Sequence, residues 1–222
     1  MLYSSFGYYS LLFGLIASLP IFIFSIINYR NEEVLDYKII IFSFIQLFLV
    51  VLSFLGLVLS FVYSDFSNET VFNNSHTTKP LFYKISGTWG NHEGSLLLWL
   101  MVLTIFIFLF LIKSKGLLKK YRILTVLFQQ IIIIGFFIFL IKSSSPFNYI
   151  FPIPEEGMGL NPILQDPALA VHPPILYLGY VGSSIIFSSV LAATTLDYIS
   201  KAWAIHIKNW VLLSWIFLTL GI

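Results

Sequence analysis

The sequence has no cysteine and little charge. Without cysteine the chain cannot form disulfides, bind zinc or iron–sulfur clusters through thiolates, or carry out thiol redox chemistry. Only 10% of its residues are Asp, Glu, Lys or Arg, whereas 58% are hydrophobic. A soluble domain of 222 residues cannot bury that much apolar surface in one core, so the composition predicts a protein embedded in lipid. The formal net charge of +2 gives no reason to expect a nucleic-acid partner.

Apolar stretches long enough to cross a bilayer recur along the chain. A helix of about 20 apolar residues crosses the hydrocarbon and satisfies its own backbone hydrogen bonds there. The sequence therefore predicts one all-α membrane domain over 1–222 with about six transmembrane helices, the first a retained anchor rather than a signal peptide. Because the last stretch stops at Ile222 without a flanking polar residue, we expect the chain to be part of something longer. The stretches lie at roughly 6–28, 39–63, 95–112, 123–141, 174–196 and from about 205 to the end.

The basic residues are distributed unevenly between the connecting segments. The segments 29–38, 113–122 and 197–208 together contain nine Lys and Arg, whereas the long loops 64–94 and 142–173 contain three. Loops rich in Lys and Arg stay on the inner side of a membrane. The sequence therefore predicts that the N-terminus and both long loops lie on the outer side.

The first long loop ends in the run Gly87-Thr88-Trp89-Gly90-Asn91-His92-Glu93-Gly94-Ser95, directly before the third apolar stretch. One interpretation is structural: Asn91 or Ser95 caps the following helix, and Glu93 faces its positive end. The other is functional, because glycine permits close backbone approach, Trp89 offers a flat apolar face and His92 and Glu93 are titratable. The residues alone leave both interpretations open.

The second long loop is rich in proline and ends at His172, directly before Pro173 and Pro174. Proline is favourable in the first turn of a helix, and the residue before a proline is pushed into an extended conformation. We therefore expect the two prolines to open the fifth helix and to hold His172 at the membrane surface. A rigidly held imidazole suits an axial metal ligand, although a loop histidine can equally be a surface residue. We expect His76 to be solvent-exposed and His206 to lie at the inner interface.

Five strings of the sequence carry a family resemblance. They are Asp65-Phe66-Ser67, the run from Trp89 to Trp99, Ser145-Pro146-Phe147, the segment from Leu160 to Pro167, and the run from His172 to Gly182. In this order, at this spacing and over essentially the whole chain, they resemble the CcmF family of cytochrome c maturation proteins. These are subunits of the haem lyase that attaches haem to the CXXCH motif of apocytochrome c.

The resemblance implies that haem, in transit to cytochrome c, binds at the outer face. It implies His172 as an axial ligand of the haem iron, with Trp89, Pro173, Pro174 and Tyr177 near the cofactor. It implies no catalytic side chain, because the thioether chemistry belongs to the haem vinyl groups and the substrate thiols. Further motif residues have no assigned chemical role: Gly90, His92, Glu93, Gly94, Ser95, Asn161, Gln165 and Asp166.

The sequence departs from the family pattern by stopping before the tryptophan-rich WWD motif and the second outer histidine. It therefore resembles the N-terminal product of a split mitochondrial gene, inactive as a haem lyase without its partner. The implied partners are C-terminal CcmF-like fragments, a CcmE-like haem chaperone, a CcmH-like thiol-handling subunit and apocytochrome c. The implied location is the mitochondrial inner membrane, with the long loops in the intermembrane space. The alternative is a bacterial cytoplasmic membrane with periplasmic loops.

Three other functions compete with this interpretation. An ion-translocating subunit needs ionisable groups within its spans, and we expect none there, because His206 and Lys208 are assigned to the inner connection 197–208. A CcmC-like haem handler or exporter of the same superfamily should carry the WWD motif. An assembly scaffold would leave every haem contact to the partner fragment.

Overall fold

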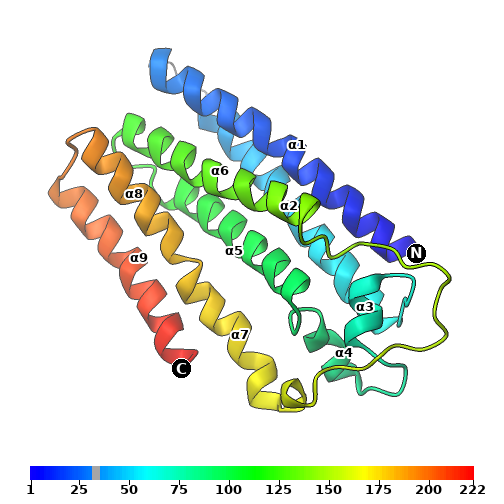
Figure 1. Cartoon of the computed structure of the whole chain (residues 1–222). Helices are drawn as coiled ribbons and strands as arrows, with labels where there is room; N and C mark the ends of the chain where they lie inside the picture. The colour runs from blue at the N-terminus through cyan, green and yellow to red at the C-terminus, as the bar shows by residue number, and fades with distance from the viewer. Residues whose placement is uncertain (32–35) are drawn as a thin grey trace.

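The computed structural model describes residues 1–31 and 36–222, and long helices dominate it (Figure 1). No strand occurs in this part of the chain, so the all-α prediction is confirmed. The connection at 32–35, within the predicted inner segment 29–38, lies outside the described residues. The long helices are α1 (Leu2–Asn31), α2 (Asp36–Val62), α5 (His92–Lys113), α6 (Lys119–Lys142), α7 (Pro167–Tyr180), α8 (Ser183–Thr195) and α9 (Lys201–Leu220). The short helices are α3 (Glu69–Asn74), α4 (Leu81–Gly87) and η1 (Pro162–Gln165).

Six segments of the described chain are long and apolar enough to cross a membrane, as predicted. Five are single helices, and the other runs from Pro167 to Thr195 through both α7 and α8. The break between α7 and α8 contains Gly182, where a Cβ atom would lie 2.2 Å from the carbonyl oxygen of Leu178 and 2.4 Å from the Phe106 ring. Only glycine therefore lets the chain pass this close to α5.

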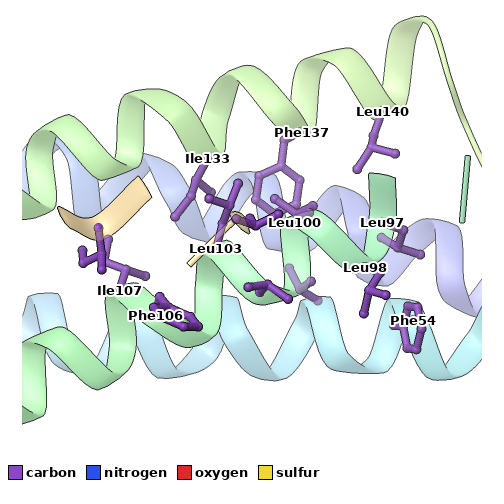
Figure 2. Close-up of a cluster of buried hydrophobic side chains, with 14 of the residues drawn as sticks. Phe54, Leu97, Leu98, Leu100, Leu103, Phe106, Ile107, Ile133, Phe137 and Leu140 are labelled. Atoms are coloured by element: carbon purple, nitrogen blue, oxygen red, sulfur yellow. The ribbon is translucent and has the colours of Figure 1, made fainter. Parts of the chain in front are cut away.

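Helix α5 supplies much of the apolar core. Figure 2 shows its leucine and phenylalanine side chains between Phe54 of α2 and Phe137 of α6. Close backbone packing joins α1 to α2, since a Cβ atom on Gly56 would lie 2.7 Å from the Cα atom of Gly7. Small residues are a common means by which membrane helices approach one another. The labelled core side chains of α5 are all buried: Leu97, Leu98, Leu100, Leu103, Phe106 and Ile107.

Buried amide side chains link α6 to its neighbours on both sides. Gln46 of α2 donates to Ser18 of α1 at 2.7 Å, and Gln130 donates to Gln46 at 3.0 Å. The adjacent Gln129 donates to Ser184 of α8 at 2.9 Å. Because such groups find no partner in hydrocarbon, their mutual hydrogen bonds fix which helices pair.

The two long loops form one layer at one end of the bundle, beside the N-terminus (Figure 1). The Asn68 side chain donates to the carbonyl of Pro146 at 2.9 Å. Farther along, the amide of Met158 donates to the carbonyl of Phe72 at 2.8 Å. We call this end the loop end, and the opposite end, which carries Lys113 and the connection before Lys119, the basic end. That the loop end faces outward stays a prediction from the charge distribution.

The structure corrects the prediction for the last span. Helix α9 begins at Lys201 with Ser200 as its N-cap, instead of at about 205. His206 and Lys208 therefore lie on a helix that forms a candidate membrane span. The expectation of spans free of ionisable side chains is wrong here: the predicted stretch from about 205 and the connection 197–208 overlapped at these two residues, and the structure places both on the helix. Both side chains lie in the half of α9 nearer the basic end.

Candidate functional site

The run from Gly87 to Ser95 is a tight turn that joins α4 to α5. The Asn91 side chain donates to the Gly87 carbonyl at 2.7 Å and accepts from the Gly94 amide at 2.7 Å. Asn91 is therefore the N-cap of α5, and Glu93 lies in the first turn near the positive helix end. The structural interpretation of this run is confirmed for these residues.

The remaining residues of the turn hold its backbone. A Cβ atom on Gly94 would lie 1.6 Å from the Thr88 carbonyl oxygen, so any larger residue would displace the turn. The Ser95 hydroxyl donates to the Trp89 carbonyl at 2.7 Å. Gly90 packs close to the Leu160 side chain of the second loop, where an added Cβ atom would lie 3.3 Å away. His92 is exposed, and its Nε2 atom lies 3.2 Å from the Ser144 hydroxyl.

Polar residues of the second loop cap the short helices that follow them. Asn161 accepts from the amide of Ile163 at 3.1 Å and starts η1, and Gln165 donates to the Leu160 carbonyl at 3.1 Å. The Asp166 carboxylate accepts from the amides of Ala168 and Leu169 at 2.8 and 3.1 Å, which makes it the N-cap of α7. These three motif residues therefore have a structural role in shaping the approach to α7.

The prolines of the His172 motif do not open the fifth span. Helix α7 begins at Pro167, and Pro173 and Pro174 lie inside it. His172 is consequently helical rather than extended, and the prediction from the proline pair was wrong. The physical reason is the stronger start signal upstream, an aspartate N-cap followed by a proline in the first turn.

The interior prolines leave backbone carbonyls of α7 without their helical donors. Proline has no N–H, so Pro174 cannot donate to the carbonyl of Ala170 four residues earlier. The Trp89 indole supplies this donor instead, at 2.8 Å. The Trp89 ring also stacks on Phe54 of α2, with 6.5 Å between the ring centroids. Trp89 thereby fastens α7 to the turn before α5 and to α2.

A cavity of about 570 Å³ lies beside this contact. Trp89, Pro173 and Tyr177 are among its lining residues, and Trp99 joins them with its ring 5.4 Å from that of Tyr177. Its volume is in the range of small-molecule pockets. Besides these aromatic residues, its polar lining residues are Ser86, Asn91, His92 and Ser95.

His172 lies in a separate hollow of about 380 Å³. The half-buried imidazole has no hydrogen-bond partner among the described residues. His172 lines this hollow and does not line the Trp89 cavity, which its neighbour Pro173 lines, because successive residues of a helix are turned by about 100°. The structure therefore groups Trp89, Pro173 and Tyr177 and places His172 apart from them; Pro174 lines neither hollow. The other residues around the imidazole are apolar: Ala168, Leu169, Val171, Ile175, Leu220, Gly221 and Ile222.

Glu156 and Lys79 are two of the charged side chains of the loop layer whose pKa values are shifted. The pKa of Glu156 is lowered to about 2, chiefly because the Thr77 hydroxyl donates to its carboxylate, with further bonds from the amides of Thr77 and Gly157. Partial burial lowers the pKa of Lys79 to about 8, and its ammonium donates to the Asn74 carbonyl at 3.2 Å. The Lys79 contact lies within the first loop, and the contact between Thr77 and Glu156 joins the first loop to the second.

Sequence reasoning missed several groups that shape both hollows. The Ala170 carbonyl could have been found from the spacing, because it lies four residues before Pro174. Trp99 appeared only as part of a motif string, and its inward direction depends on how α5 packs against α7. The end of α9, at Leu220 and Gly221, has no signal in the sequence that would link it to His172.

Comparison with known proteins gives consistent matches. The description of the matching family is "Cytochrome C assembly protein", and the match covers residues 89–222. The cytochrome c-type biogenesis protein CycK of Bradyrhizobium diazoefficiens is 50% identical over 177 residues, 80% of this chain and 27% of CycK. The corresponding protein CcmF of Escherichia coli is 39% identical over 82% of this chain and 28% of its own length. The chain thus spans about a quarter of the length of these relatives.

A solved structure named "Cytochrome c Heme Lyase CcmF" has the same fold. It superposes with a TM-score of 0.83 at 24% identity, covering 99% of this chain and 35% of that one. The family match over residues 89–222 includes all the residues that line the His172 hollow and all but Ser86 of those that line the Trp89 cavity. This chain therefore belongs to the cytochrome c assembly protein family.

Proposed function

We propose that the chain is a subunit of the cytochrome c haem lyase that binds the substrate haem at its loop end through His172. The observation that carries the proposal is a half-buried imidazole that faces an apolar hollow, in a member of the cytochrome c assembly family. The relatives' names point to the same process, because they are called cytochrome c-type biogenesis proteins.

The residues around His172 fit one face of a haem. The porphyrin supplies four nitrogen ligands to iron, so the protein needs to add only an axial imidazole. The apolar side chains of Val171 and Ile175 can pack against the hydrophobic ring. A further protein ligand of the iron would come from a partner chain, the C-terminal fragment that the sequence resemblance implies.

The other motif residues support this function by positioning helix α7. Asp166 caps the helix, and the Trp89 indole replaces a backbone donor lost at Pro174. Both contacts restrict the movement of the helix that carries His172. In this proposal Trp89, Pro173, Pro174 and Tyr177 act on the haem site through α7, as positioning residues.

The chain contributes binding and orientation rather than a reacting group. The thioether bond joins a haem vinyl group to a cysteine thiol of the CXXCH motif, and this chain has no thiol of its own. Holding haem and peptide in a fixed mutual orientation lowers the entropic part of the barrier. The reducing equivalents that keep the substrate thiols free must come from a partner.

The proposed assembly contains this chain, C-terminal CcmF-like fragments, a CcmE-like haem chaperone and a CcmH-like subunit. Apocytochrome c is the protein substrate. We place the assembly in the mitochondrial inner membrane with the loop end in the intermembrane space; the alternative is a bacterial membrane with the loop end in the periplasm. The charge distribution of the connecting segments supports this orientation.

The test is the haem content of the assembled complex carrying His172→Ala. We expect most of the haem at this site to be lost, while His92→Ala and His76→Ala retain it, because these histidines lie at the same end outside the His172 hollow. Haem is measured by the absorbance of its pyridine complex per mole of protein. Wild-type haem content in His172→Ala would contradict the proposal and favour an assembly scaffold.

A further inference from the structure

A groove of about 420 Å³ lies between α5 and α9 on the half of the bundle nearer the basic end. Its polar lining consists of Lys113, His206 and Asn209. Its apolar lining consists of Leu109, Trp210 and Leu213. Of the described residues that line it, none is acidic, and neither the haem proposal nor the motif strings involve this groove.

Three polar side chains of the groove carry hydrogen-bond donors. The Nε2 atom of His206 accepts from the Trp210 indole at 3.0 Å, so the proton of the neutral ring is on Nδ1, which can donate. The Lys113 ammonium carries three donors and a positive charge, and the Asn209 amide carries two donors. This donor set suits the oxygen atoms of an anion.

Packing against α5 fixes the position of His206. Its ring lies 5.6 Å from that of Phe110 in an edge-to-face arrangement, and the Trp210 ring lies 6.3 Å from Phe110. Trp210 is buried. The imidazole is therefore held by two aromatic neighbours instead of moving freely in lipid.

Along the helices, the polar residues of the groove lie nearer the basic end and its leucines nearer the middle of the bundle, as a lipid headgroup and its first methylenes require. Lys113 is the last residue of α5, and His206 lies five residues, or about 8 Å, from the start of α9. Leu109 and Leu213 lie farther toward the middle of the bundle, one turn beyond Lys113 and Asn209. Basic pockets between transmembrane helices are known sites for anionic headgroups.

We propose that this groove binds one anionic phospholipid. Lys113, His206 and Asn209 hold the phosphate, and Leu109, Trp210 and Leu213 contact the acyl chains. The function of such a lipid would be to fasten α9 to α5, since α9 is the least buried of the candidate spans. The proposal is independent of haem binding.

The test compares the assembled complex in nanodiscs of phosphatidylcholine with and without phosphatidylglycerol. After transfer to detergent, native mass spectrometry counts retained lipids. We expect one retained phosphatidylglycerol per chain, and Lys113→Gln should weaken its retention about fivefold, the effect of one basic side chain near an anionic headgroup. His206→Leu should weaken it as well, whereas Lys115→Gln, which changes a basic residue outside the groove lining, should not.

Two controls separate the alternatives. Haem content should be unchanged in Lys113→Gln, and this result would show that the complex remains assembled. Because the groove and the His172 hollow share no lining residue, failure of the haem proposal would be a separate result. Inorganic phosphate should not displace the retained lipid, because the acyl chains contribute to binding. Equal retention of phosphatidylcholine, or displacement by inorganic phosphate, would overturn the proposal.

Discussion

Trp89 was expected to lie beside a porphyrin, and the structure gives it a contact with a backbone group. Its indole N–H donates at 2.8 Å to the carbonyl of Ala170, which Pro174 leaves without a helical donor. The sequence contains both residues behind this contact, Trp89 and Pro174, but Pro174 was expected at the start of the helix rather than inside it. Their pairing could not be predicted, because 81 residues separate Trp89 from Ala170 and no local pattern connects them.

Trp89→Phe should destabilise the protein by about 1–3 kcal/mol, the cost of a buried carbonyl left without a donor. Thermal unfolding in detergent measures the change. Trp215→Phe, at an exposed position of α9, is the matched control and should have little effect. In a Pro174→Ala background, where the helix regains its own N–H donor, the cost of Trp89→Phe should fall; an equal cost in both backgrounds would contradict the assigned contact.

Glu156 gives a prediction for pH. Its folded-state pKa, about 2, is below the ordinary glutamate value, so its contribution to stability is complete above about pH 4.5 and is lost as the pH falls toward 2. Thr77→Ala removes the main cause of the shift and should raise the pKa. Carboxyl carbon NMR of labelled glutamate measures both titrations. A Glu156 titration near the ordinary value in the wild type would contradict the contact between the loops.

Among the elements, α7 shows where sequence reasoning succeeded and where it failed. The fifth span was predicted, but its start was placed at Pro174 instead of Pro167. The capping signal Asp166-Pro167 lies upstream of the proline pair in the sequence, and it starts the helix. By contrast, the structural interpretation of the run before α5, one of the two left open, is confirmed for the Asn91 cap and for Glu93 in the first turn, because the capping signal is local.

Asp166→Ala should loosen the first turn of α7. An N-cap contributes about 1 kcal/mol, and here the interior prolines leave the helix with few alternative bonds. Hydrogen exchange of the amides of Ala168 and Leu169 should accelerate, and the haem content of the assembled complex should fall. Glu155→Ala, the loss of an exposed carboxylate in the same loop, should change neither; unchanged exchange in Asp166→Ala would show that the cap is unimportant.

For the whole molecule, hydropathy predicted the number of spans and the composition predicted the helical class. These signals are strong because lipid demands long apolar helices whose backbone groups are satisfied internally. The arrangement of the spans could not be predicted, since the glutamine contacts between α2, α6 and α8 depend on which helices are neighbours. The separation of His172 from Trp89 likewise follows from the direction of side chains around α7.

The most direct measurement is electron paramagnetic resonance of the haem iron in the assembled complex carrying His172→Gly, with and without added imidazole. A glycine opens space where the axial ligand stood, and free imidazole can occupy it. We expect the variant to lose the low-spin signal of histidine-ligated haem and to regain it when imidazole is added. An unchanged low-spin signal in the variant without imidazole would contradict ligation of the substrate haem by His172.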